Sequence, residues 1–181
     1  SRPLGVTGIT VFGLTVNNKI YDGTVTAPLD TNNISYSGLV DGDDFTGTYS
    51  GVFDNANVGT GKTVTITSSY GGTDVNNYTI TDQTSTTADV TAKALTATAS
   101  ASNKTYDASD TATTTLTLSG FIGTETVTST NSSTFNDKNV GTGKTVTVNS
   151  ITLADGTNGG LAANYSISTC LLYTSDAADE W

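Results

Sequence analysis

The sequence contains no histidine, a single cysteine, two prolines and only seven basic side chains in 181 residues. Without histidine, the usual general base for a serine or cysteine nucleophile is missing, and so is the commonest metal ligand. A single cysteine excludes both a disulfide framework and a zinc site built from cysteines. We therefore predict that the protein is not an enzyme and carries no cofactor.

Positive charge is scarce, because the formal net charge is −10 and the isoelectric point is near 4.1. Nucleic acids and anionic membrane surfaces bind basic footprints, so neither is an expected partner. No apolar run reaches the roughly 18 to 20 residues of a membrane span, which argues against membrane insertion. The chain opens at Ser1 without a basic and then apolar signal segment, so we expect an internal fragment of a longer protein.

Threonine and glycine are abundant, and long helical periodicity is absent. Threonine favours pleated, half-buried strands, and the 19 glycines favour turns. This composition predicts an all-β protein.

One stretch occurs twice almost letter for letter, at residues 53–66 and 135–148. Each copy starts with Phe, contains Asn-Val-Gly-Thr-Gly and ends in Lys-Thr-Val-Thr followed by Ile or Val. The repeat predicts two modules of about 80 residues, at 1–82 and 93–169, joined by a linker at 83–92. We expect two tandem small β-sandwich-like modules, with β-grasp-like sheets as the alternative.

Asn-Val-Gly-Thr-Gly is typical of a glycine-rich turn, and Lys-Thr-Val-Thr of the strand that follows it. Alternation at period two predicts core positions for Val64, Ile66, Val146 and Val148, and outward positions for Thr63, Thr65, Thr145 and Thr147. Lys62 and Lys144 are expected to be solvated charges. Gly-Lys-Thr also ends a phosphate-binding loop, but Ala56 and Lys138 replace its first glycine, and a strand follows where that loop needs a helix.

Three further motifs recur in the same order in both copies. Tyr21-Asp22-Gly23 is matched by Tyr106-Asp107-Ala108; Asp-Gly is a strong turn signal, and Tyr21 is expected to anchor this turn on the core. A strand crossed by a glycine is expected at 36–40 and 118–122. Asn-Tyr-x-Ile belongs to the expected closing strands at 74–80 and 161–167, and the first strand of the chain is expected at 9–16.

Together, Lys-x-Tyr-Asp-Gly, Ser-Gly-Leu with Gly-Asp-Asp, Phe-x-x-x-Asn-Val-Gly-Thr-Gly-Lys-x-Val and Asn-Tyr-x-Ile resemble the YDG-domain repeat of large bacterial adhesins. The resemblance spans nearly all of residues 9–168. It implies an all-β repeat of very long secreted or cell-surface proteins of the filamentous-haemagglutinin kind. The second copy departs from the pattern at Ala108 and at 123–125. The residues that match the family motif, with expected structural roles, are Tyr21, Asp22, Gly23, Asn57, Gly59, Gly61, Tyr78, Tyr106, Asp107, Asn139, Gly141, Gly143 and Tyr165.

The resemblance implies a stalk or passenger role outside the bacterial cell, in which the partners of each module are neighbouring repeats of the same long chain. The alternative is an adhesion module that binds a host glycan or a host protein. Such a module would present exposed aromatic residues in one copy only, and Tyr49 and Tyr70 are the two residues that fit this pattern.

Residues 170–181 fit no repeat. The stretch from Cys170 to Glu180 looks like the in-frame translation of a sequencing adapter, so we expect a non-native tail. Residues 171–181 are then expected to be disordered or to pack on nothing. Removing the tail leaves a chain without cysteine, which fits an exported protein.

Two kinds of chemistry remain as weaker hypotheses. Asp41, Asp43 and Asp44 form the densest acidic cluster and are weak candidates for Ca²⁺ ligands, although the equivalent turn of the second copy keeps only Glu125. Adjacent carboxylates on one turn do not make the facing pair of a glycosidase. An isopeptide bond to an asparagine is conceivable through Lys19, Lys62, Lys104 or Lys144, but no acid repeats beside these lysines in both copies.

Overall fold

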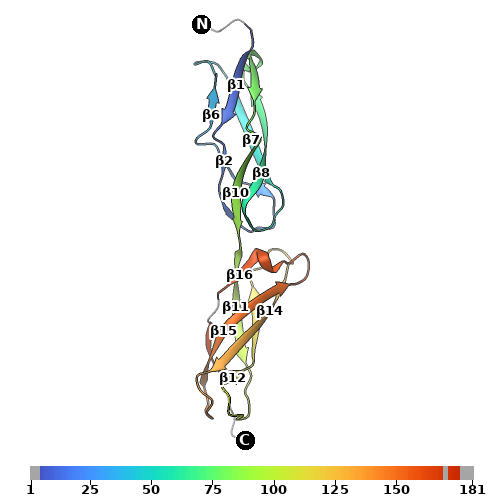
Figure 1. The fold of residues 1–181 in the computed structure, drawn as a ribbon. Helices are drawn as coiled ribbons and strands as arrows, with labels where there is room; N and C mark the ends of the chain where they lie inside the picture. The colour runs from blue at the N-terminus through green and yellow to red at the C-terminus, as the bar shows by residue number, and fades with distance from the viewer. Residues whose placement is uncertain (1–4, 169–170, 176–181) are drawn as a thin grey trace. The chain divides into compact units, whose positions relative to one another are not determined.

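The computed structural model describes residues 5–168 and 171–175, and the regular secondary structure of these residues is almost all β-strand (Figure 1). It divides into two compact units, Ser1–Thr91 and Ala92–Trp181, which we call the first and second modules. Each module is β-sandwich-like, with two curled sheets that enclose a small core, as the sequence predicts. In the described residues, no helix is both long and apolar enough to cross a bilayer.

The first module contains two main sheets. Its elements are β1 (Thr7–Phe12), β2 (Thr15–Val16), β3 (Lys19–Ile20), β4 (Thr26–Ala27), β5 (Leu29–Asp30), β6 (Ser35–Ser37), β7 (Thr46–Phe53), β8 (Gly59–Gly71), the 3-10 turn η1 (Val75–Asn77), β9 (Tyr78–Thr81) and β10 (Ser85–Thr91). One sheet has the order β6-β1-β9, and the other has the order β3-β10-β8-β7-β4. The pair β2 and β5 forms a separate ribbon.

The core of the first module lies between these sheets. Ile9 and Val11 of β1 alternate inward and meet Ile66 of β8 and Tyr78 of β9. The strand expected at 9–16 is interrupted at Gly13, whose φ is +88°. A side chain there would place its Cβ 2.1 Å from a backbone oxygen, so this position requires glycine.

The second module repeats this plan. Its elements are β11 (Lys93–Ala101), β12 (Thr111–Ala112), β13 (Thr114–Ser119), β14 (Val127–Phe135), β15 (Lys144–Asp155), the 3-10 turn η2 (Ala162–Asn164), β16 (Tyr165–Ile167) and β17 (Leu171–Ser175). The sheet orders are β13-β11-β16 and β12-β14-β15-β17. Leu95, Val127, Phe135 and Tyr165 are buried between the two sheets.

The alternation predicted for the repeated strand is confirmed. Val64, Val146 and Val148 have 0% exposed surface and Ile66 has 7%. The intervening threonines Thr63 and Thr65 are exposed, and Thr145 and Thr147 are half-buried.

The structure differs from the expected linker at 83–92, because these residues contain strand β10. β10 pairs antiparallel with β8, and Ala88 and Val90 are buried. Threonine and alanine supply most of its inward positions, so the apolar alternation is too weak to recognise in the sequence. A single residue, Ala92, separates β10 from β11.

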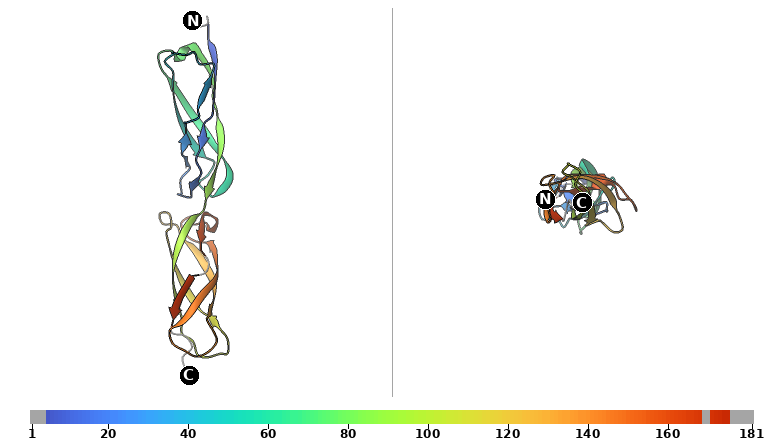
Figure 2. Two further views of the ribbon diagram at one scale, coloured as in Figure 1. Left: turned by 90° about the vertical axis from the view of Figure 1, so that its left-hand side faces the viewer. Right: turned by 90° about the horizontal axis from the view of Figure 1, so that it is seen from below.

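The expectation that residues 171–181 pack on nothing is wrong for the first five of them. β17 pairs antiparallel with β15 from Val148 opposite Leu171 to Lys144 opposite Ser175, and it runs beside β15 in Figure 2. β17 lies at the edge of its sheet. Residues 176–181 lie outside the described residues, and the adapter origin of the tail stays a prediction.

Candidate functional site: lysine-capped loops around a buried phenylalanine

The lysine of the repeated motif is buried, which contradicts its expected role as a solvated charge. Lys62 has 9% exposed surface, and its Nζ donates to the backbone oxygen of Asn55 at 3.0 Å and to Asn55 Oδ1 at 2.6 Å. A third bond goes to the backbone oxygen of Asn57. The Asp54 carboxylate lies 3.6 Å from the same nitrogen. The ammonium therefore satisfies the inward-facing carbonyls of the loop between β7 and β8.

The second module builds the same cap. Lys144 is 8% exposed, and its Nζ donates to the backbone oxygen of Asp137 at 3.0 Å. It also donates to the Asp137 carboxylate and to the backbone oxygen of Asn139. The Lys144 ammonium, together with the backbone N–H of Asn139, holds the pKa of the Asp137 carboxyl below its usual value. The acid and the amide have exchanged places between the copies, since Asp54-Asn55 corresponds to Asn136-Asp137.

The glycines of the motif make room for the lysine and shape the loop. A Cβ on Gly59 would lie 3.0 Å from Lys62 Cδ, and one on Gly141 would lie 3.5 Å from Lys144 Cδ, so the lysine stem lies along each glycine. Gly61 and Gly143 both have a φ of +60°, which favours glycine. In the first module this segment forms part of β8, which begins at Gly59, and not the separate turn that was expected.

A second lysine caps the neighbouring loop in each module. Lys19 Nζ donates to Asp22 Oδ1 at 3.0 Å and to the backbone oxygens of Thr24 at 3.0 Å and Thr26 at 2.8 Å. Burial acts to raise the pKa of Asp22, but hydrogen bonds from the Thr24 N–H and from Lys19 outweigh it, and the pKa is lowered. The Tyr-Asp-Gly turn is therefore closed by its own lysine.

The second copy of this turn keeps the lysine bonds to the aspartate and to the residue two positions after it, despite its changed sequence. Lys104 Nζ donates to Asp107 Oδ1 at 3.0 Å and to the backbone oxygen of Ser109 at 2.9 Å. The Lys104 bond, followed by the Ser109 N–H, lowers the pKa of Asp107. Ala108 has a φ of +65°, where Gly23 has +77°. Alanine thus takes the left-handed conformation that the turn demands, at a steric cost that glycine avoids.

The two lysine caps of the first module meet at one buried ring. Lys19 Nζ lies 5.4 Å and Lys62 Nζ 5.9 Å from the centroid of Phe53, which is 3% exposed. In the second module Lys104 Nζ lies 5.6 Å from the ring of Phe135, which is 4% exposed. Cation–π attraction of this kind contributes roughly 0.5 to 2 kcal/mol. The Tyr-Asp-Gly and Asn-Val-Gly-Thr-Gly-Lys motifs are therefore two parts of one structural unit.

The chemistry of this unit is that of a fixed cation. Attack of a lysine on an asparagine amide needs the neutral amine, because only that form has a free electron pair. Lys62 Nζ instead directs its three hydrogens to three oxygens, including the Asn55 amide oxygen that such an attack would activate. The geometry favours a charged cap over an isopeptide bond.

The family described as the YDG domain matches residues 7–87 and again residues 91–171. The chain belongs to the YDG-domain family. No curated protein and no solved structure gave a significant match. In both YDG domains of this chain, the lysine and the glycines of the family motif therefore form the cap of one loop.

A buried tyrosine locks a second loop in each YDG domain. Tyr78 accepts a hydrogen bond from the Val40 N–H at 3.0 Å and donates to the Asp43 carboxylate. Tyr165 likewise accepts from the Ile122 N–H at 3.0 Å. Burial raises the pKa of Tyr165, and the nearby Glu125 carboxylate raises it further. Asp43 and Glu125 each stand ten residues before the buried phenylalanine of their domain, so they are equivalent positions. In both domains the acid of this turn interacts with the buried tyrosine.

The three weak calcium candidates do not share one site, because Asp43 and Asp44 bind different groups. Asp43 holds Tyr78, and Asp44 Oδ2 accepts from the Thr73 N–H at 2.8 Å. The Asp44 N–H in turn donates to Asp74 at 2.7 Å, and Asp41 is exposed. Within residues 5–168 and 171–175, no group of three or more His, Cys, Asp or Glu side chains is arranged to hold a metal ion.

The signature tyrosines of the two Tyr-Asp-Gly turns differ in burial. Tyr21 is 6% exposed, and its N–H donates to the backbone oxygen of Thr91 at the end of β10. Tyr106 is 48% exposed. The anchoring role expected for Tyr21 agrees with this burial, and in the first domain the end of β10 runs beside the turn.

Tyr49 and Tyr70 come together in the first domain, as part of an aromatic cluster and not as isolated exposed rings. Their centroids are 6.0 Å apart, and the hydroxyls of Tyr49 and Tyr36 are hydrogen-bonded at 2.6 Å. Burial raises the pKa of Tyr49, and its bond to Tyr36 adds to the effect. Tyr70 donates to the Asp82 carboxylate. All three tyrosines are half-buried against the core.

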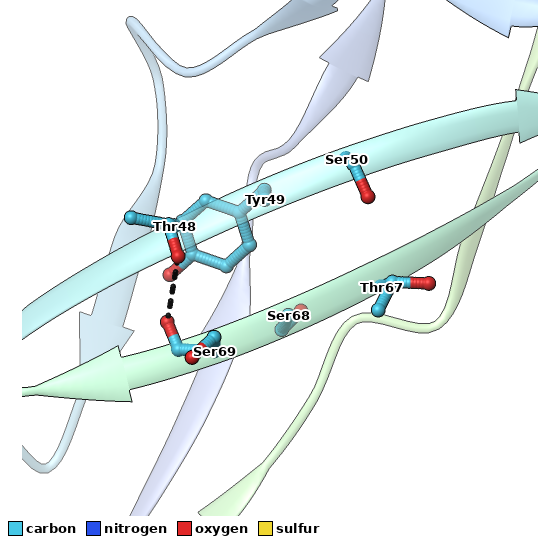
Figure 3. Close-up of a pocket in the computed structure, with 6 residues that line it drawn as sticks. All are labelled: Thr48, Tyr49, Ser50, Thr67, Ser68 and Ser69. Atoms are coloured by element: carbon cyan, nitrogen blue, oxygen red, sulfur yellow. Dashed lines mark hydrogen bonds between the residues drawn. The ribbon is translucent and has the colours of Figure 1, made fainter.

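A shallow depression of about 200 Å³ lies beside Tyr49 on the ribbon of β7 and β8. Figure 3 shows its lining, which is otherwise made of hydroxyl side chains, and the bond from Thr48 to the backbone oxygen of Ser69 (3.4 Å). A sugar needs an exposed ring face together with free polar groups. Here the tyrosine hydroxyls bind one another or a carboxylate.

Proposed function

We propose that the two YDG domains are non-catalytic stalk or passenger repeats of a secreted or cell-surface bacterial adhesin. In this role they lengthen the chain and resist unfolding, and their partners are the neighbouring repeats of the same protein.

This proposal is supported by the observation that the residues of the family motif bind groups within their own domain. Lys62 and Lys144 donate to the loops of their own domains, and Phe53 is buried beneath two such caps. A catalytic or ligand-binding signature needs side chains that face a substrate. Motif residues that cap loops instead stabilise the fold of each repeat.

The connection between the domains supports the same role. β10 lies between β3 and β8 in the second sheet of the first domain, and only Ala92 separates it from β11. A one-residue junction between two like modules suits a tandem array, in which each repeat is a separate folding unit.

The alternative, binding of a host glycan or protein, has one observation in its favour. The aromatic cluster of Tyr36, Tyr49 and Tyr70 occurs in the first domain, while the positions of Tyr36 and Tyr49 are Leu118 and Asn131 in the second. These rings are half-buried and their hydroxyls are engaged. The cluster therefore extends the core more than it presents a platform.

Single-molecule stretching of the tandem tests the stalk role. We expect two separate unfolding steps, each releasing about 30 nm, because each domain holds about 85 residues at roughly 0.36 nm per extended residue. Gradual extension without steps would contradict a load-bearing repeat.

A glycan array tests the alternative with the same chain. The stalk role predicts no reproducible, saturable binding. A hit that disappears in Tyr49→Ser, and survives in Asn131→Ser of the second domain, would replace the stalk role with a binding role.

A further inference from the structure

The same sheet position is filled by unrelated segments in the two YDG domains. β10 pairs with β8, with Ala88 opposite Lys62 and Thr86 opposite Val64. β17 pairs with β15, with Ser175 opposite Lys144 and Tyr173 opposite Val146. The paired segments read Ser-Thr-Thr-Ala and Leu-Leu-Tyr-Thr-Ser, which share no pattern. The position is therefore defined by the backbone that receives the strand and not by the sequence that fills it.

β8 and β15, the strands that pair with the added strand, turn equivalent backbone groups toward it in the two domains. The Thr63 and Thr145 carbonyls accept from Asp54 and Asn136, on the side of β7 and β14. Because successive residues of a strand turn their N–H and C=O groups to opposite sides, Val64 and Val146 face the added strand. The Ile66 N–H bonds the Thr84 oxygen at 2.9 Å, which confirms this orientation in the first domain.

The added strand covers a vulnerable edge. Val146 and Val148 have 0% exposed surface, and Lys144 is 8% exposed. Without a strand beside them, their outward N–H and C=O groups would form an open edge next to core residues. Main-chain hydrogen bonds supply the affinity when an extended peptide joins such an edge.

We propose that the edge of β15 over Lys144–Val148 is a β-strand acceptor site. Its occupant is an extended YDG-repeat segment equivalent to residues 84–91, which a second copy of this chain can supply when the site's own strand is displaced. This site does not depend on the stalk role, because it is inferred from the strand pairing of β8 and β15 alone.

Two proline variants of the full chain test which bonds hold the strand. Tyr173→Pro removes an N–H that faces Val146, whereas Thr174→Pro removes one that points away from β15. We expect amide exchange at Val146 and Val148 to accelerate by roughly tenfold or more in Tyr173→Pro and to change little in Thr174→Pro. Equal exchange in the two variants would overturn the proposed acceptor.

Rescue by a peptide then tests the acceptor in trans. A synthetic peptide of residues 84–91, added to Tyr173→Pro, should restore protection at Val146 and Val148. The same peptide carrying Thr86→Pro should not, because Thr86 occupies the position that Tyr173 holds in β17. If Tyr173→Pro unfolds the second domain outright, refolding must depend on the unmodified peptide. No rescue, or equal rescue by both peptides, would overturn the proposal.

Discussion

The two YDG domains share their loops but differ in the space between their sheets. In the first domain Phe45 packs edge-on against Tyr36 at 5.2 Å and Tyr78 at 5.8 Å, and stacks on Tyr70 at 5.5 Å. In the second domain, Val127 takes the place of Phe45 and lines an open hollow of about 410 Å³. The lysine caps are identical in plan, so the family signature specifies the ends of the sandwich and leaves the interior free to vary.

The second domain compensates in part by moving its aromatic residue. Phe121, which stands where the first domain has Leu39, packs edge-on against Tyr165 at 5.4 Å. One aromatic partner for the buried tyrosine is thus kept, from a different position. The remaining rings have no equivalents, so the first domain is expected to gain more stability from its interior.

The largest expected effect follows from removing the central ring of the aromatic cluster. Phe45→Ala should destabilise the first domain by about 3 to 5 kcal/mol, because a large side chain is lost with three ring contacts. Val127→Ala, the matched change in the second domain, should cost about 1 to 2 kcal/mol, since the space beside it is already open. Calorimetry of the full chain can assign each loss to a domain, and equal losses would contradict the difference between the interiors.

The loop caps should respond alike in both domains. Lys62→Met and Lys144→Met keep the stem and remove the ammonium, which leaves loop carbonyls without their donor. Each should cost about 2 to 4 kcal/mol, because buried acceptors lose charged hydrogen bonds. Chemical denaturation measures the loss, and Lys138→Met, at an exposed lysine within the second capped loop, is the control. A loss in only one domain would show that the caps are not equivalent.

The sequence predicts the core valines well, because alternation at period two is strong between Lys62 and Ile66. Several expected strands are wrong in their bounds. The strands expected at 36–40 and 118–122 end at residues 37 and 119, and 3-10 turns occupy 75–77 and 162–164 within the expected closing strands. It does not predict the caps, since a lysine that begins a strand is normally solvated and its acceptors are backbone oxygens. One signal was available: an Asn or Asp with a side-chain oxygen stands seven residues before the lysine in both copies. The strand β10 was missed because Thr86 and Ala88 carry too little hydrophobicity to mark an inward face.

The repeated valines provide a test of equal burial. Val64→Ala and Val146→Ala should each cost about 1 to 3 kcal/mol, because both side chains have 0% exposed surface. Thermal unfolding of the two variants measures the loss. Thr63→Ala, on the exposed side of the same strand, should be near neutral. A silent valine change would place that residue outside the core.

Filling the open hollow beside Val127 should reverse part of the difference between the domains. Val127→Phe restores the aromatic residue of the first domain next to the open space lined by Leu116 and Leu118. We expect a gain of about 1 kcal/mol in the second domain, from apolar surface removed from water. A loss of stability would mean that the surrounding side chains cannot accept the ring. Differential scanning calorimetry reads the shift in that domain alone.

The smallest expected effect is a difference between the two domains in how their stability depends on acidic pH. The pKa of Asp137 is lowered by Lys144, so its carboxylate stabilises the second domain above the unfolded pKa of about 3.9. That contribution is lost as the pH falls through the lower folded pKa. The corresponding Asn55 does not titrate. Asp137→Asn should therefore flatten the acid dependence of the second domain below about pH 4, and Asn55→Asp should steepen that of the first. Hydrogen exchange measured between pH 5 and 2 resolves the two domains, and unchanged slopes in both variants would show that the acid of the cap does not contribute to stability.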